Sequence, residues 1–96
     1  MAESDRTEVL DERRRRMRYR AWHRGTREMD LVLGRFADSE LAGLNDGEVA
    51  ELEALMEVPD PELLTWILGQ SPPPAQFDTP LFRRLTEFHR AGRGLK

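Results

Sequence analysis

Residues 26–41 read TREMDLVLGRFADSEL, and this stretch decides the fold class. Its apolar side chains recur at intervals of three and four residues, as Met29, Val32, Leu33, Phe36 and Ala37. This spacing places them on one face of an α-helix, so we predict a helix over about residues 26–41. Because a helix with one apolar stripe must bury it against other elements, the neighbouring segments determine the architecture.

Residues 6–23 also favour a helix, since they are rich in Glu, Arg, Met and Leu, which are strong helix formers. Only Leu10, Met17 and Ala21 have apolar side chains at helical spacing, with Trp22 beside them. We therefore expect the N-terminal half of this helix to be exposed or frayed.

Three further helices are marked by capping residues. An N-cap residue is followed by a capping-box glutamate or by a first-turn proline in the pairs Asn45 and Glu48, Asp60 and Pro61, and Thr79 and Pro80. The apolar residues that we expect to face inward are Val49, Leu52, Leu55, Met56, Leu63, Leu64, Trp66, Ile67, Leu68, Leu81, Phe82, Leu85 and Phe88. Gly69 and Gly92 follow two of these helices, where glycine can adopt a left-handed conformation.

The predicted fold is all-α, a compact five-helix bundle with a proline-rich connector before the last helix. That connector is the run Ser71–Pro74, which cannot be helical and should be extended. We divide the chain into a charged, partly frayed N-terminal helical arm (1–17), a five-helix domain (18–92) and a short tail (93–96).

Size and composition favour a binding protein over an enzyme. A chain of 96 residues leaves little interior for a deep catalytic cleft, and the absence of cysteine excludes disulfides and thiol chemistry. No apolar stretch approaches the roughly 18 residues that span a bilayer, and the acidic first dozen residues do not resemble a targeting signal. We expect a cytoplasmic protein without membrane insertion.

Charge is unevenly distributed along the chain, although the net charge is only −3. Residues 13–27 contain eight arginines and no acid, whereas residues 38–62 contain nine acids and no Lys or Arg. We explain the two runs separately, each as a solvated helix face. The arginines at positions 13, 16, 20 and 24 can form one basic stripe, which leaves a nucleic-acid or regulatory binding module as the alternative function.

Residues 24–30, RGTREMD, lie between the first two predicted helices, and we call them the elbow. Gly25 suits a position of positive φ after one helix, and Thr26 can cap the next. The charged residues Arg24, Arg27, Glu28 and Asp30 then lie on a sharp corner, where we expect Arg24 and Glu28 to be exposed groups. Taken alone, Glu28 and Asp30 could simply complement the positive end of the helix dipole.

The elbow resembles the RGxxE motif of the SdhE flavinator family, called succinate dehydrogenase assembly factor 2 in mitochondria. The segment from Asp30 to Ala37, DPELLTW at 60–66 and DTPLFRRL at 78–85 are also similar to family sequences, so the resemblance covers roughly residues 18–92. Arg24, Gly25 and Glu28 match the motif, while Arg27 and Asp30 match positions common beside it.

This resemblance implies an assembly factor, not an enzyme, that promotes covalent FAD attachment to the flavoprotein subunit of succinate dehydrogenase. The factor binds that subunit before the iron–sulfur subunit does, and the subunit of fumarate reductase is a second candidate client. We expect no cofactor of the chain's own, no metal, no nucleic acid, and a monomer when free. The expected partner-binding residues are Arg24, Gly25, Arg27, Glu28 and Asp30.

Several other residues that could suggest metal binding or catalysis are better explained by structural roles. His23 and His89 lack a third ligand at suitable spacing, so we interpret them as surface or packing residues. Asp60, Pro61 and Trp66 are explained as a helix cap, a first-turn proline and a core aromatic. No nucleophile and base are arranged as a catalytic set.

Overall fold

The computed structural model of the chain describes residues 10–92. These residues form five α-helices and no strand. The α-helices are α2 (Glu12–Trp22), α3 (Arg27–Glu40), α4 (Asp46–Met56), α5 (Asp60–Ile67) and α6 (Pro80–Arg90). Two short 3-10 helices are η1 (Leu41–Gly43) and η2 (Ala75–Phe77). The prediction of an all-α five-helix bundle is confirmed.

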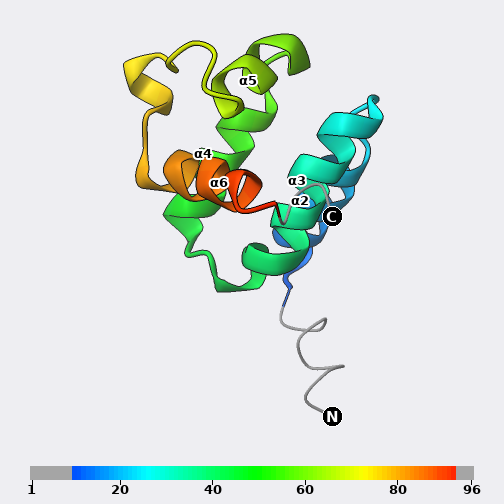
Figure 1. The fold of residues 1–96 in the computed structure, drawn as a ribbon. Helices are drawn as coiled ribbons and strands as arrows, with labels where there is room; N and C mark the ends of the chain where they lie inside the picture. The colour runs from blue at the N-terminus through cyan, green and yellow to red at the C-terminus, as the bar shows by residue number, and fades with distance from the viewer. Residues whose placement is uncertain (1–9, 93–96) are drawn as a thin grey trace.

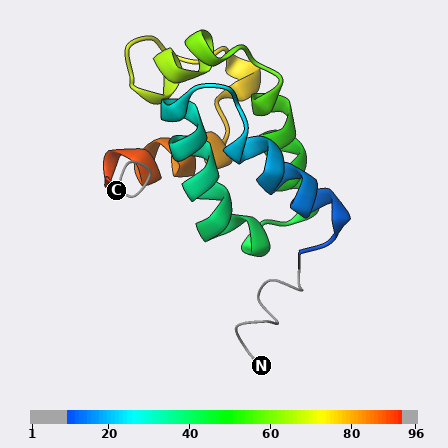
Figure 2. The same cartoon turned by 90° about the vertical axis from the view of Figure 1, so that its right-hand side faces the viewer.

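Helices α2 and α3 lie side by side and antiparallel, and we call this pair the α2–α3 hairpin (Figures 1 and 2). Helix α4 contacts α2 on one side and α6 on the other, and α6 also contacts α3 and α5. The proline-rich connector and η2 run from α5 to α6 along the edge far from the hairpin (Figure 1). The elbow therefore lies at a corner of the molecule, close to the junction between α4 and α5.

A single apolar core joins all five helices. The buried side chains repeat at helical spacing, as Met17 and Ala21 in α2, Met29, Val32, Leu33, Phe36 and Ala37 in α3, Val49, Leu52, Leu55 and Met56 in α4, Leu63 and Ile67 in α5, and Leu81, Phe82, Leu85 and Phe88 in α6. No polar or charged residue is buried within the described part of the chain. The core is thus closed by apolar packing, and charged groups are left to the surface and the helix junctions.

Most predicted helix boundaries are confirmed. Asn45 and Glu48 form a capping box, and Thr79 accepts the backbone N–H of Phe82 at 3.1 Å. Gly69 has φ +76° and follows α5 as predicted. The 3-10 turn η2 is an addition that the proline run did not predict.

The predicted start of the first helix is wrong. Helix α2 begins at Glu12, because Asp11 is its N-cap and accepts the backbone N–H of Arg14 at 2.9 Å. Leu10 lies before the helix, and its side chain is buried in the core. Residues 1–9 of the predicted arm and the predicted tail 93–96 lie outside the described residues, and the proposed division of the chain stays a prediction.

Helix α5 and the residue after it bury fewer apolar side chains than the sequence predicts. Trp66 is only partly buried and packs beside Phe77, with ring centroids 5.5 Å apart. Leu68 is 45% exposed. An eight-residue helix at the edge of the bundle covers the core with only a narrow stripe, here Leu63 and Ile67. The prediction that Trp66 is a buried core aromatic is therefore wrong.

Candidate functional site

The elbow turns the chain between α2 and α3 as the sequence predicts. Gly25 has φ +116°, a conformation that side chains with a Cβ rarely adopt. A Cβ at this position would meet nothing within 4 Å, so the backbone angle and not crowding requires glycine. Thr26 then begins α3, and its hydroxyl oxygen accepts the backbone N–H of Met29 at 3.3 Å.

Asp30 closes the elbow from inside. One oxygen of its carboxylate accepts the backbone N–H of Arg24 at 2.6 Å and that of Gly25 at 3.3 Å. Arg24 and Gly25 lie between the two helices, so their N–H groups have no helical carbonyl to bond. Leaving a backbone N–H unsatisfied would destabilise the fold. Asp30 is thus a structural part of the turn, and its charge is directed into the turn.

Arg24 ties the elbow to the junction between α4 and α5. Its guanidinium donates to the Asp60 carboxylate at 2.6 and 2.9 Å, to the Met56 carbonyl at 2.6 Å and to the Val58 carbonyl at 3.0 Å. The Arg24 side chain is only 11% exposed. The expectation that Arg24 is an exposed group is therefore wrong, because carbonyls at the C-terminus of α4 and a nearby carboxylate attract the cation inward.

Asp60 also differs from its predicted role. Helix α5 begins at Asp60 itself, after Pro59, and no side chain caps it. The Asp60 carboxylate pairs with Arg24 and is 18% exposed. Sequence reasoning interpreted this residue as an N-cap and missed the ion pair, since the two residues are far apart in sequence.

Arg27 and Glu28 form the outer side of the elbow. Both are exposed, and within residues 10–92 neither side chain makes a hydrogen bond or ion pair. Gly25 is exposed beside them and presents bare backbone. Of the five predicted partner-binding residues, the structure therefore directs Gly25, Arg27 and Glu28 outward and Arg24 and Asp30 inward.

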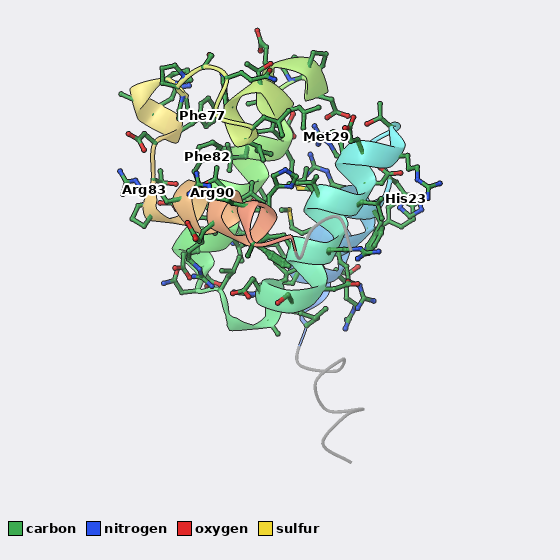
Figure 3. All side chains as sticks on the ribbon, in the orientation of Figure 1. His23, Met29, Phe77, Phe82, Arg83 and Arg90 are labelled. Atoms are coloured by element: carbon green, nitrogen blue, oxygen red, sulfur yellow. The ribbon has the colours of Figure 1, made fainter. Side chains whose placement is uncertain are left out.

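A shallow hollow of about 180 Å³ adjoins Glu28. It lies between the first turns of α3 and α5 and is lined by Thr26, Glu28, Met29, Asp60, Pro61 and Leu64. Figure 3 shows Met29 on the inner side of the α2–α3 hairpin, facing α5. The elbow thus offers an acid and a small apolar depression side by side, which suits one side chain of a partner.

The family model described as Sdh5, flavinator of succinate dehydrogenase, matches residues 15–89. The chain belongs to this family. The FAD assembly factor SdhE of Acetobacter pasteurianus is 41% identical over 85 residues, which are 88% of this chain and 78% of that protein. The FAD assembly factor SdhE of Ralstonia nicotianae is 35% identical over 79 residues, 82% of each chain.

A mitochondrial protein is similar over a shorter share of its length. Succinate dehydrogenase assembly factor 2 of Dictyostelium discoideum is 30% identical over 80 residues, 83% of this chain and 56% of that protein. The chain thus spans about half the length of this relative. No solved structure matches the chain.

In this member of the flavinator family, the basic and acidic runs pair with each other across α2, α4 and the start of α5. Arg14 pairs with Asp46 at 3.1 Å, and three further arginine–carboxylate pairs join the runs, namely Arg13 with Glu53 at 2.8 Å, Arg20 with Glu57 at 2.7 Å, and Arg24 with Asp60 at 2.6 Å. We call the last three pairs the ion-pair ladder. The expectation that the two charged runs need separate explanations is wrong, because the packing of α2 on α4 brings them together.

The ladder leaves no free basic stripe on this face of α2. Arg13 donates to both oxygens of Glu53, at 2.8 and 2.9 Å, which is the bidentate geometry of a strong pair. This hydrogen bond lowers the pKa of Glu53 below its ordinary value. Arg16 pairs with Glu12 of its own helix at 3.6 Å. All four arginines of the predicted nucleic-acid stripe therefore already have carboxylate partners.

A contact between Trp22 and Gly34 holds the hairpin together, and sequence reasoning did not identify it. A Cβ at Gly34 would lie 2.3 Å from a ring carbon of Trp22, so only glycine allows this approach. The indole N–H donates to Asp38 at 3.2 Å. An isolated glycine within a strongly helical pattern was the available signal, because such a glycine often marks close packing.

Within residues 10–92, His23 and His89 are not grouped with other residues as a metal-binding or acid–base site. The Nδ1 atom of His23 lies 2.6 Å from the Tyr19 carbonyl, and the two rings stack with centroids 3.9 Å apart. The Nδ1 atom of His89 is buried with no hydrogen-bond partner in the described structure. Among residues 10–92, no group of three potential metal ligands is found and no helix is long and apolar enough to cross a membrane.

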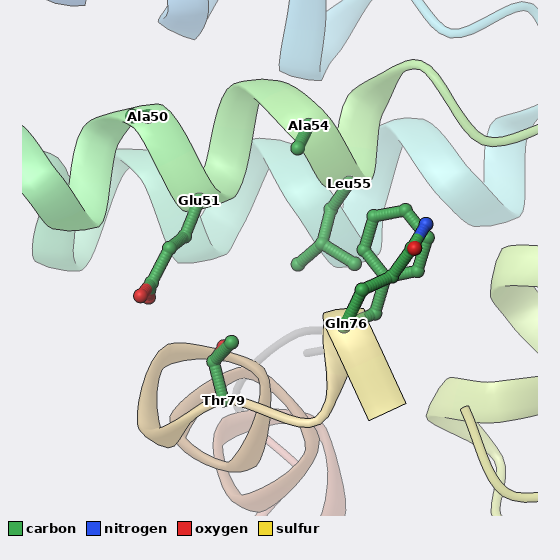
Figure 4. Close-up of a pocket in the computed structure, with 7 residues that line it drawn as sticks. Ala50, Glu51, Ala54, Leu55, Gln76 and Thr79 are labelled. Carbon is green, nitrogen blue, oxygen red and sulfur yellow. The ribbon is translucent and has the colours of Figure 1, made fainter. Parts of the chain in front are cut away.

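A second hollow, of about 210 Å³, lies between α4 and the segment that leads into α6 (Figure 4). Its walls include the small residues Ala50 and Ala54 of α4 together with Gln76 and Phe77 of η2. Glu51 is the one titratable group in its lining. This hollow lacks the paired groups that acid–base or nucleophilic chemistry needs, and it is separate from the elbow.

Proposed function

We propose that this chain is an assembly factor that promotes covalent attachment of FAD to the flavoprotein subunit of succinate dehydrogenase. Membership of the flavinator family supports the proposal, as do the names of its relatives, which are FAD and succinate dehydrogenase assembly factors. The structural observation that supports it most is the outer side of the elbow. There a rigid turn presents Gly25, Arg27 and Glu28 without internal partners.

The FAD in this proposal belongs to the partner. The hollow beside the elbow, about 180 Å³, is smaller than the roughly 300–1,000 Å³ of pockets that enclose small-molecule ligands. Its lining includes apolar side chains and two acids, which do not suit the diphosphate of a dinucleotide. We therefore propose that the chain binds no FAD of its own and acts on the flavin held by its partner.

The mechanism that fits this surface is positional. Covalent linkage requires a flavin carbon and a protein side chain to be held at reacting distance, and restraining them in that geometry can accelerate bond formation greatly. A rigid elbow docked against the flavoprotein would restrain its domains in this arrangement. The chain would act before the iron–sulfur subunit binds, and fumarate reductase would offer a related client subunit.

Glu28 provides the sharpest test of this function. A strain lacking the gene is complemented with the wild-type chain, with Glu28→Gln or with Glu87→Gln, and covalent flavin fluorescence is measured in the denatured flavoprotein band. Glu87 is a matched control, because it is an exposed acid on α6 that pairs only with Arg90. We expect Glu28→Gln to reduce the fluorescence severalfold and Glu87→Gln to restore it fully.

The two variants should have the same melting temperature, since both change exposed side chains. Undiminished covalent flavin in the deletion strain would refute the proposed function. Full activity of a folded Glu28→Gln chain would refute the role of the elbow and leave the function itself intact.

A further inference from the structure

The arginines of the chain fall into two groups when their partners are compared. Within residues 10–92, nine of the twelve arginines donate to a carboxylate or to a backbone carbonyl, as the pairs and hydrogen bonds of the structure show. The three without any partner in this part of the chain are Arg18, Arg27 and Arg35. All three belong to α2 or α3, although α6 carries arginines as well.

Helical spacing places these three arginines outside the buried stripes of the α2–α3 hairpin, with Arg27 exposed and Arg18 and Arg35 partly exposed. Arg18 precedes Trp22 by one helical turn, and Trp22 lies over Gly34 and Asp38 on α3. Arg27 and Arg35 lie two turns apart, opposite the buried stripe that contains Met29 and Phe36. We call this surface the arginine face. It borders the elbow, because Arg27 belongs to both.

The arginine face is positive although the chain as a whole carries a net charge of −3. Two acids lie among its three arginines, namely Glu28 beside Arg27 and Asp38, whose carboxylate accepts the Trp22 indole N–H, so the arginines exceed the acids by one. Tyr19 lies near the end of α2 that leads into the elbow, and it is 65% exposed. Its ring stacks on that of His23, which lies at the outer edge of the molecule (Figure 3). Arginine and tyrosine side chains on a solvent-accessible surface are enriched in protein interfaces.

We propose that the arginine face docks on an acidic surface of the flavoprotein that the elbow contacts. This inference rests on the proposed function and adds the chemistry of the partner's surface. Unpaired guanidinium groups attract carboxylates and accelerate encounter, since complementary charge raises association rates by about 10- to 1,000-fold. Because the face continues directly into the outer side of the elbow, one partner can cover both.

A protein surface fits this face better than a nucleic acid does. Three unpaired cations are few beside the roughly 6–10 phosphate contacts of a typical DNA-binding protein. One face of each nearby ring is already covered, because Tyr19 stacks on His23 and Trp22 lies on Gly34, and this reduces the ring surface on which a base could stack. The net negative charge of the chain also opposes binding to a polyanion.

The test measures association of the purified chain with the purified flavoprotein subunit, before its flavin is covalently linked, at low and high ionic strength. The test variant is the triple substitution Arg18→Gln, Arg27→Gln and Arg35→Gln. The control is the triple substitution Arg16→Gln, Arg83→Gln and Arg90→Gln. Both change the net charge equally, and the control arginines are exposed and pair only within their own segments.

We expect the test variant to associate about tenfold more slowly than wild type at low ionic strength, and the difference to shrink at high ionic strength because salt screens exposed charges. The control should associate like wild type. Equal rates for the two triple variants would overturn the proposal. Binding of duplex DNA by the wild-type chain that is lost in the test variant would also overturn it, in favour of a nucleic-acid partner.

This experiment separates the arginine face from the proposed function. If wild type does not bind the flavoprotein at all, the proposed function fails as well. If wild type binds and supports flavinylation while the test variant behaves like the control, the arginine face alone fails.

Discussion

The inner and outer sides of the elbow use similar charged residues in opposite ways. On the inner side, Arg24 and Asp30 are engaged by backbone groups and by Asp60, and they join α2, α3 and the α4–α5 junction. On the outer side, Arg27 and Glu28 have no partner in the described structure. Within one short motif, Arg24 and Asp30 therefore stabilise the fold, while Arg27 and Glu28 remain available to bind a partner.

This difference changes how loss of function at the elbow is interpreted. A defect caused by replacing Arg24 would not show that Arg24 contacts a partner, because the fold itself loses an anchor. A defect caused by replacing Glu28 would carry that meaning, since no internal contact is lost. The predictions below test this division, from the largest expected effect to the smallest.

The largest effect is expected from Arg24→Ala. The substitution leaves the Asp60 carboxylate, which is 18% exposed, without its cation and removes the donors to the Met56 and Val58 carbonyls. Breaking such a pair by removing one partner costs about 3 kcal/mol, the lower end of the range for buried pairs. Urea unfolding followed by circular dichroism measures the change.

The matched substitution on the outer side is Arg27→Ala, which should change the free energy of unfolding by no more than about 0.5 kcal/mol. Equal stability of the two variants would contradict the division of the elbow into an anchoring and a recognising side.

A smaller effect is expected from Gly25→Ala. No atom would clash with the added Cβ, but φ at +116° strains any residue that has one, so we expect a loss of about 1 kcal/mol. Gly43→Ala is the control, because that glycine has no positive φ and also has open space around it. It should be neutral or slightly stabilising in the same unfolding measurement.

If Gly25→Ala and Gly43→Ala unfold at the same urea concentration, the elbow is not held at the observed angle. The rigid presentation of Glu28 would then lose its basis, and the outer side would be a flexible turn.

The smallest effect concerns the ion-pair ladder and depends on pH. The pKa of Glu53 is lowered in the folded chain, mainly by the hydrogen bond from Arg13. Its stabilising contribution is therefore complete above the ordinary pKa of about 4.5 and is lost as the pH falls through the lower folded value. We expect less than about 1 kcal/mol, since both side chains are about one-third exposed.

Thermal melts of wild type and Glu53→Gln across the acid range measure this contribution. The stability difference between the two chains should diminish as the pH falls below about 4.5. In an Arg13→Gln background the same substitution should show a weaker pH dependence, because only the charges of Arg20 and Arg16 then lower the Glu53 pKa. A difference that is constant with pH would mean that the pair does not form in solution.

Sequence reasoning succeeded where the interactions are local. The apolar spacing in residues 26–41 and the capping box at Asn45 involve residues three or four positions apart, and the structure confirms both. Gly25 and Thr26 were predictable for the same reason, because a turn residue and an N-cap act on their immediate neighbours.

The wrong start of α2 was a missed local cap, Asp11, but the errors at Asp60 and Trp66 share a cause in long-range packing. Asp60 looked like a cap because it precedes Pro61, yet its partner Arg24 is 36 residues away. Trp66 looked like a core residue because it is large and apolar, but α5 lies at an edge and buries only a narrow stripe. Neither outcome can be obtained from spacing within one helix.

By itself, the sequence determined the five helices, most of their boundaries, the sharp elbow and the resemblance to the flavinator family. Only the tertiary structure decided which charges of the elbow are anchored and which are free. The physical reason is that the three pairs of the ladder join residues 36 to 40 positions apart. Helical periodicity gives the face of a helix on which a side chain lies, but the packing of α2 against α4 determines whether that face meets a carboxylate or water.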